Sequence, residues 1–221
     1  MGASPEHGPQ RPGEAFDRSS VEFGRSVSFF DAIYGFAITL LVTNIDLPPA
    51  RSWSSMSALL DSGLISQIFG FLLSFVVIAV FWRVNYRITA GILLMTPPVI
   101  VWNTVAAFFI VLLPFTTQGT SDPGTSDFAL PTALYAANIA LASLAQAALR
   151  LSARRQGRVP GARTLIRLAQ ALPHATVPAV FLASIPVTFL AGPGPGRLVW
   201  ASLLVLGPLT GRLEDKARPG A

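Results

Sequence analysis

Residues 64–86, LISQIFGFLLSFVVIAVFWRVNY, decide the class of fold. The stretch is apolar along nearly its whole length, and its one charged residue, Arg83, comes close to its end. A helix needs about 20 mostly apolar residues to cross the hydrocarbon core of a bilayer. The stretch therefore predicts a transmembrane helix.

Five further stretches on either side have the same character, and none shows the alternation of apolar and polar residues that a membrane β-barrel requires. The sequence therefore predicts an all-α integral membrane protein with six transmembrane helices. The six predicted spans are residues 26–47, 64–86, 93–114, 129–150, 172–191 and 197–213.

The composition agrees with a membrane protein. Apolar residues make up 52% of the 221 residues and charged residues 12%, whereas soluble domains carry about 25% charged residues. A soluble globular enzyme is therefore excluded, and the absence of Cys excludes a disulfide scaffold and a thiolate metal site. We find no catalytic motif, and two isolated His residues do not make a metal site, so we expect neither an enzyme nor a bound cofactor.

The basic residues indicate how the chain crosses the membrane. With six spans and a cytoplasmic N-terminus, 14 of the 16 Lys and Arg residues lie inside, and only Arg51 and Arg197 lie outside. This positive-inside bias predicts a multi-pass protein of the cell membrane, here a bacterial inner membrane, with both termini cytoplasmic. It also explains the basic charge without a nucleic-acid partner. We expect flexible tails at residues 1–24 and 214–221 around a transmembrane domain of residues 25–213.

Asp31 is the one acidic residue well inside an apolar span. Such a residue is costly in a membrane, so it faces protein or water and often marks function. Two interpretations remain open: a structural lock with a donor on another helix, or contact with a transported species. Arg25 lies about 240° around the helix from Asp31 and does not share its face. The candidate donors at a similar depth in the second span are Arg83, Asn85, Tyr86 and Arg87.

The first span also carries a stripe at helical spacing, formed by Phe36, Leu40, Thr43 and Leu47, with Thr39 beside it. If this face lined a symmetric pore, Phe36 and Leu40 would form hydrophobic rings that gate by dewetting, and the threonine hydroxyls would offer ligands to a cation. An apolar stripe is also the ordinary pattern of helix packing, and spacing alone does not decide between the two.

The segment Arg25–Asp31, RSVSFFD, resembles the opening helix of the transmembrane protein 175 family of potassium channels, whose signature is R-x-x-x-F-S-D. Arg25, Phe29 and Asp31 match this signature, whereas Phe30 stands where the family has Ser. The substitution removes a hydroxyl from the hydrogen-bond cluster that the motif forms in the family.

Two later segments are also similar to the family. LSFVVIAVFWRVNYR in the second span resembles its S-F-x-x-I-x-x-x-W stretch, and Asn103 and the PFTT of residues 114–117 resemble its third span and outer turn. The residues that match in the second span are Ser74, Phe75, Ile78 and Trp82.

The resemblance implies a homotetramer in which the first helix of each subunit lines a central pore for monovalent cations, with potassium favoured over sodium and no TVGYG filter. Phe36 then stands at the family's apolar constriction, with Leu40 one turn outward, and Thr39 at a position associated with selectivity. Arg25, Phe29, Phe30 and Asp31 would hold the cytoplasmic end.

Asp46 lies at the predicted outer end of the first span. Because the C-terminal end of a helix carries about half a negative charge, four copies of Asp46 there would concentrate cations.

The alternative function is a proton-coupled secondary transporter that alternates access, with Asp31 as its proton site and His174 as a helper. Broken helices in two repeated halves would favour it. The sequence shows spans interrupted by proline but no two-half symmetry.

Overall fold

The computed structural model describes the backbone of residues 15–154 and 164–203, and the side chains in these ranges other than those of residues 164–174. The side chain of His174, the predicted C-terminal tail and most of the predicted N-terminal tail therefore lie outside the described residues.

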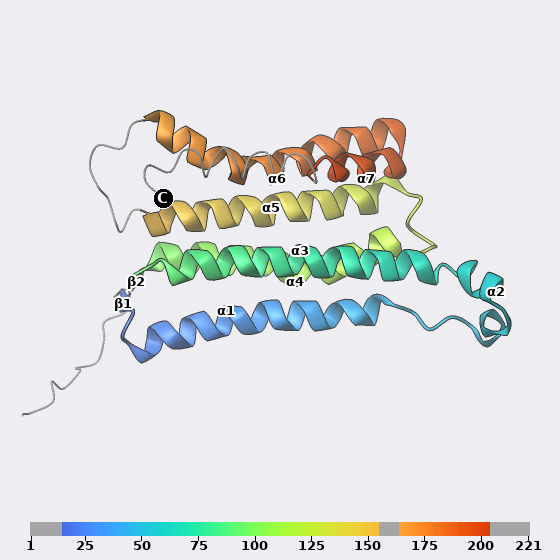
Figure 1. The fold of residues 1–221 in the computed structure, drawn as a ribbon, viewed down its shortest axis with the longest axis horizontal. Helices are drawn as coiled ribbons and strands as arrows, with labels where there is room; N and C mark the ends of the chain where they lie inside the picture. Colours follow the sequence, from blue (N-terminus) through green and yellow to red (C-terminus); the bar gives the residue numbers. More distant parts are fainter. Residues whose placement is uncertain (1–14, 155–163, 204–221) are drawn as a thin grey trace, which may run out of the picture.

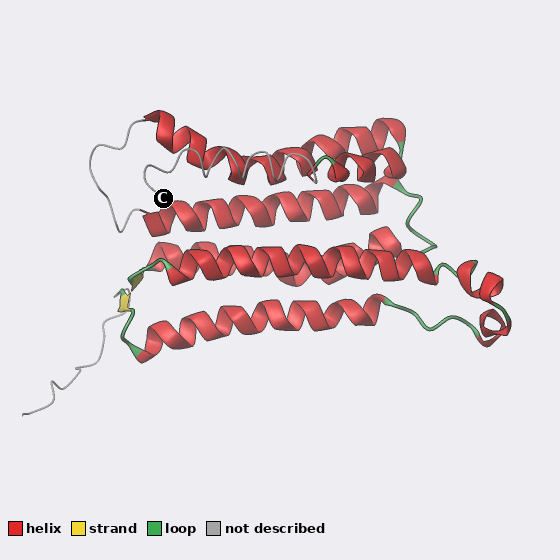
Figure 2. Cartoon of the chain, in the orientation of Figure 1, coloured by secondary structure: helices red, strands yellow, loops and turns green. Residues whose placement is uncertain are grey.

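Long helices that alternate in direction make up the fold, as Figure 1 shows, and Figure 2 shows how little of the described chain is not helical. A short helix, α7 (Pro193–Ala201), packs back against α6. Two-residue strands β1 (Phe16–Asp17) and β2 (Leu94–Met95) pair at one end of the bundle. The long helices are α1 (Val21–Leu40), α3 (Leu64–Ala90), α4 (Pro97–Ser121), α5 (Ala129–Arg154) and α6 (Thr164–Ala191).

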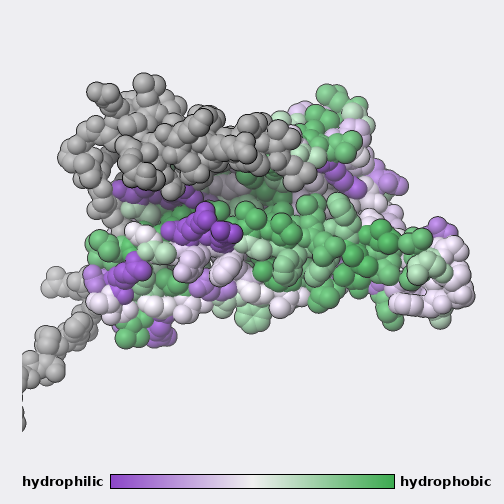
Figure 3. Space-filling view, in the orientation of Figure 1, coloured by the Kyte–Doolittle hydropathy of each residue, from purple (hydrophilic) through white to green (hydrophobic). Residues whose placement is uncertain are grey.

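Four helices in the described ranges are long and apolar enough to cross a membrane: α1 with its 3₁₀ extension, α3, α4 and α5. Figure 3 shows the apolar surface along the length of α3 and hydrophilic residues toward the end that holds β1. The predicted fifth span lies inside α6, and α7 covers the start of the predicted sixth span, whose later residues lie outside the described ranges. The protein is thus a helical, multi-pass membrane protein.

The first helix begins and ends earlier than the predicted span of residues 26–47. It starts at Val21 because the Ser20 side chain caps it, accepting a hydrogen bond from the Phe23 amide at 3.2 Å. It tightens into a 3₁₀ turn, η1 (Leu41–Asn44), and the chain is extended at Ile45. A loop with a second 3₁₀ turn, η2 (Ala50–Ser54), and the short helix α2 (Met56–Leu60) leads to α3.

Helix α4 begins at Pro97, where proline costs no hydrogen bond. The prediction that residues 114–117 form an outer turn is wrong, because α4 continues through Pro114 to Ser121. Membrane helices tolerate proline where neighbouring groups satisfy the backbone. Near this proline, the Asn44 amide donates to the Pro114 carbonyl at 2.6 Å, and the Thr117 hydroxyl donates to the Leu113 carbonyl at 2.7 Å. Neither bond replaces the one that Pro114, which has no amide hydrogen, cannot donate to the Ile110 carbonyl, but the first ties α4 to the end of the first helical segment.

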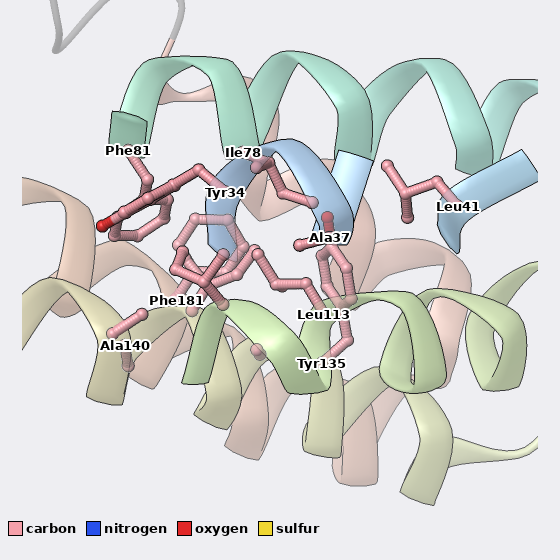
Figure 4. Close-up of a cluster of buried hydrophobic side chains, with 13 residues drawn as sticks. Tyr34, Ala37, Leu41, Ile78, Phe81, Leu113, Tyr135, Ala140 and Phe181 are labelled. Carbon is pink, nitrogen blue, oxygen red and sulfur yellow. The ribbon is translucent and has the colours of Figure 1, made fainter. Parts of the chain in front are cut away.

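One face of α1 contributes to a core that all five long helices share. Figure 4 shows Tyr34 and Ala37 of α1 and Leu41 of η1 pointing toward side chains of the other helices. The partners labelled there are Ile78 and Phe81 of α3, Leu113 of α4, Tyr135 and Ala140 of α5, and Phe181 of α6. This burial fixes which face of α1 turns away from the bundle.

Candidate functional site

Helix α1 has two faces that differ sharply in exposure. Tyr34 and Leu41 are 1% and 0% exposed, whereas Phe36 is 71% and Leu40 is 46% exposed. With 100° per residue, Phe36 and Leu40 lie on the side of the helix away from the buried face. The structure thus places Phe36, Leu40, Thr39 and Thr43 on surface that the other residues of the described ranges do not cover.

The two threonines on this face have the same geometry. The Thr39 hydroxyl donates to the Phe36 carbonyl at 2.8 Å, and the Thr43 hydroxyl donates to the Leu40 carbonyl at 2.7 Å. Each hydroxyl therefore uses its hydrogen within the helix. Since a hydroxyl oxygen has two acceptor lone pairs, both oxygens keep the capacity to face a cation.

Leu47 is not on the stripe that helical spacing predicts, because regular helix ends before it. The chain is already extended at Ile45 (φ −100°, ψ 102°), so the step of 100° per residue no longer applies. Leu47 is 84% exposed in the loop that follows. Its neighbour Asp46 is exposed, and the Asp46 backbone amide donates to the Gln67 side chain at 2.9 Å.

Asp31 is half-buried and has a donor on another helix. The Trp82 indole nitrogen of α3 donates to a carboxylate oxygen of Asp31 at 2.9 Å. This donor is not among the four residues that depth alone suggested. Asn85, one of those four, is buried and donates instead to the Asn103 side chain of α4 at 2.6 Å. The depth of Asp31 in the membrane correctly predicted which end of α3 holds its donor. The rotation of α3 about its own axis decides which side chain at that end reaches Asp31.

The motif residues that precede Asp31 are placed on different sides of α1. Arg25 is exposed and Phe29 is 61% exposed, whereas Phe30 is only 3% exposed. The rings of Phe29 and Phe30 meet edge to face, with centroids 5.5 Å apart. Phe30 therefore contributes buried apolar surface at the position where the family motif carries a hydroxyl.

Sequence reasoning missed Gln146 of α5, which ties α1 to the bundle. Its side-chain amide donates to the Tyr34 hydroxyl at 3.2 Å and to the Phe81 carbonyl at 2.8 Å, and all three residues are buried. An amide side chain inside an apolar span is the signal that could have found it, because polar groups in a membrane interior seek partners on neighbouring helices. Within the described ranges, no three His, Asp or Glu side chains gather into a group that could hold a metal ion.

A comparison with protein-family models gives a match that begins within α1, includes α3 and ends within α4. Residues 25–114 match the family model described as endosomal/lysosomal potassium channel TMEM175. This segment of the chain is similar to the TMEM175 family. The match begins at Arg25, the first residue of the signature in the first span, and the resemblance read from the sequence is confirmed.

Two further comparisons agree with this family. A potassium channel of Chryseobacterium sp. (strain P1-3) is 24% identical over 123 residues, which are 55% of this chain and 60% of that protein, so the aligned part spans less than two thirds of the relative. The fold is similar to the crystal structure of a lysosomal potassium-selective channel TMEM175 homolog from Chamaesiphon minutus. That similarity has a TM-score of 0.63 at 22% identity, and covers 90% of this chain and all of the other.

Proposed function

We propose that this chain is a potassium-selective channel of the TMEM175 family for monovalent cations, formed by four copies of a six-helix subunit with both termini in the cytoplasm. The exposed face of α1 from each copy encloses the pore, with no TVGYG filter. The permeant ions and the bilayer are the partners that this function needs.

The observation that carries the proposal is the uncovered face of α1. In Figure 1, α1 lies at the edge of the bundle, on the side of α3 and α4 that is away from α6 and α7. Its exposed face carries two back-bonded threonines between bulky apolar residues, an arrangement that lipid contact alone does not require. In the proposed tetramer this face contacts the water of the pore and the same face of α1 in the other subunits.

Phe36 and Leu40 form the gate in this proposal. A bare cation in a low-dielectric environment costs tens of kcal/mol, so an apolar ring passes ions only while it is wide enough to stay hydrated. Four Phe36 rings make a bulky constriction, which closes when it dewets. We therefore expect low potassium conductance in the resting state.

Thr39 and Thr43 assist partly dehydrated ions, because their hydroxyl oxygens keep free lone pairs when their hydrogens are bound within the helix. Asp46 concentrates cations at the outer mouth. Its position is supported by two contacts that hold the end of α1, Asn44 to α4 and the Asp46 amide to α3. Leu47 follows the end of the helix, so in this proposal it lies at the outer entrance of the pore and is not part of the stripe.

Arg25, Phe29, Phe30 and Asp31 hold the cytoplasmic end of α1 in this proposal. The Trp82 indole can only donate, so its bond to the Asp31 carboxylate suits a structural lock between α1 and α3. For this reason we assign Asp31 to the lock rather than to the proton site of a carrier.

The basic residues support the proposed orientation. Arg18, Arg25, Arg87 and Arg154 lie at or near the helix ends on the side of the bundle that holds β1, while Arg51 and Arg197 belong to the opposite end. By the positive-inside rule, the β1 end is the cytoplasmic one.

The proposal is tested by potassium flux into liposomes that contain the purified protein, with the subunit number measured by native mass spectrometry. Phe36→Ala should raise potassium flux because it widens the constriction. Phe189→Ala is the matched control, since Phe189 is 59% exposed on α6, far from α1. Tetramers in which Phe36→Ala passes no more potassium than the parent would overturn the gate, and monomers would overturn the pore.

A further inference from the structure

The chain just before α1 is tied to the turn between α3 and α4. Strand β1 pairs antiparallel with β2, so that Phe16 lies opposite Met95 and Asp17 lies opposite Leu94. The Arg18 backbone amide extends the pairing by donating to the Leu93 carbonyl at 2.9 Å. We call residues 16–18 and 93–95 the clasp. Figure 1 shows it at the N-terminal end of α1.

The Arg18 side chain strengthens the clasp at the end of α3. Its guanidinium donates to the Ala90 carbonyl at 2.6 Å and contacts the Ile92 carbonyl at 3.4 Å. Ala90 is the last residue of α3. The last carbonyls of a helix lack partners within it and carry partial negative charge, so a cation with several donors is well suited to this position.

The linker between the clasp and α1 is short and held by hydrogen bonds. Only Ser19 and Ser20 separate Arg18 from Val21, and both are fixed. The Ser20 amide donates to the Asp17 carbonyl at 2.9 Å, and the Ser19 amide and hydroxyl donate to the Asp17 carboxylate at 2.9 and 2.6 Å. The two hydrogen bonds from Ser19, first that of its hydroxyl and then that of its amide, hold the pKa of the Asp17 carboxyl below its usual value. Two residues later, Phe23 of α1 packs with Ile88, Ile92 and Met95 in a second buried cluster.

We propose that Arg18 is a positioning residue for the gate: with the clasp, it sets the depth and rotation of α1 and so holds the Phe36 and Leu40 rings against the pore axis. This role rests on the proposed function. A helix rises 1.5 Å per residue, so Phe36 lies about 22 Å from Val21 along one continuous helix. A tilt or rotation at the clasp is therefore carried to the gate.

The first test is potassium flux through Arg18→Ala in liposomes. Loss of one or two net hydrogen bonds should raise the flux about fivefold to tenfold, because displaced Phe36 rings no longer close together. Arg154→Ala removes one exposed positive charge at the same end of the bundle and is the matched control, with flux like that of the parent. Native mass spectrometry should give the same subunit number for all three proteins.

The second test restores the clasp covalently in the Arg18→Ala background. Opposed residues of an antiparallel pair have Cα atoms about 4.5 to 5.5 Å apart, within the range of a disulfide. Asp17→Cys with Leu94→Cys therefore adds one bond to a chain that has no Cys of its own. Oxidation of this triple variant should return the flux to the parent level, and reduction should raise it again.

Three outcomes are informative. Parent-like flux in an assembled Arg18→Ala protein overturns the positioning role, and so does raised flux that the disulfide does not lower. If Arg18 has only a structural role, Arg18→Ala changes the yield or the melting temperature of the protein. The potassium flux of the triple variant is then the same whether its disulfide is oxidised or reduced. Failure of the proposed function is recognised separately, because then neither the parent nor Phe36→Ala passes potassium.

Discussion

Helices α1 and α5 are both apolar and long enough to cross a membrane, yet they meet their surroundings in opposite ways. In the most apolar stretch of each, 61% of α5 is buried in the molecule but only 22% of α1. Figure 1 shows the reason, since α5 runs between the α3–α4 layer and α6, whereas α1 has neighbours on one side. Hydrophobicity alone therefore does not tell a core helix from one that faces outward.

The small side chains of α5 are what make its central position possible. Ala136, Ala140 and Ala142 are 0% exposed, and small residues allow membrane helices to approach closely. In α1, by contrast, the bulky Phe29, Phe36 and Leu40 point away from the bundle. Side-chain size, read together with hydrophobicity, therefore separates the packed helix from the uncovered one.

The largest expected effect comes from two neighbouring leucines of the first helical segment, which test its two faces directly. Leu41→Ala should lower the free energy of unfolding by about 2–5 kcal/mol, because it leaves a cavity in the core. Leu40→Ala should change stability by less than about 0.5 kcal/mol and raise potassium flux instead. SDS-induced unfolding in mixed micelles, with flux in liposomes, measures both. Equal losses of stability would contradict the two-faced description of α1.

An intermediate effect is expected where α5 holds α1 by hydrogen bonds. Gln146→Leu should lower the free energy of unfolding by about 0.6–1.7 kcal/mol, between the average and the maximum measured for hydrogen bonds between membrane helices, because it leaves Tyr34 and the Phe81 carbonyl without this donor. Gln118→Leu is the control, since Gln118 is exposed on α4. If the two variants unfold alike, Gln146 does not anchor α1.

The smallest expected effect concerns the half-buried bond between Asp31 and Trp82. A double-mutant cycle with Asp31→Ala and Trp82→Phe should give a coupling of about 0.6 kcal/mol, typical of interhelical hydrogen bonds in membranes. Trp102→Phe on α4 serves as the control pairing and should show no coupling to Asp31→Ala. A coupling free energy of zero between Asp31 and Trp82 would show that this bond does not lock α1 to α3.

The resemblance to TMEM175 channels and the class of fold could be predicted from the sequence because both rest on local signals. The apolar runs predicted the long helices α3, α4 and α5. The ends of α1 and α4 were missed for specific reasons. The Ser20 side chain caps α1 and so starts it before the predicted span, and α4 continues through Pro114 although proline usually ends a helix.

The candidate site could be predicted only in part. Phe36, Leu40 and Thr39 follow from helical spacing together with the family motif, and all three lie on the uncovered face. The place of Leu47 was missed because spacing assumes a helix that here has already ended. Trp82 and Gln146 were missed as partners of Asp31 and Tyr34 because a contact between helices depends on the rotation of each.

By itself, the sequence determined that this protein is helical, membrane-spanning and similar to TMEM175 channels over its first spans, because apolar runs and a short motif are properties of consecutive residues. Only the tertiary structure decided which face of α1 is buried, which donor reaches Asp31 and how Arg18 closes the end of α3. These are contacts between residues far apart in the chain, up to 112 positions in the case of Tyr34 and Gln146. They exist only once the helices have packed, since packing sets the rotation and depth of each helix against its neighbours.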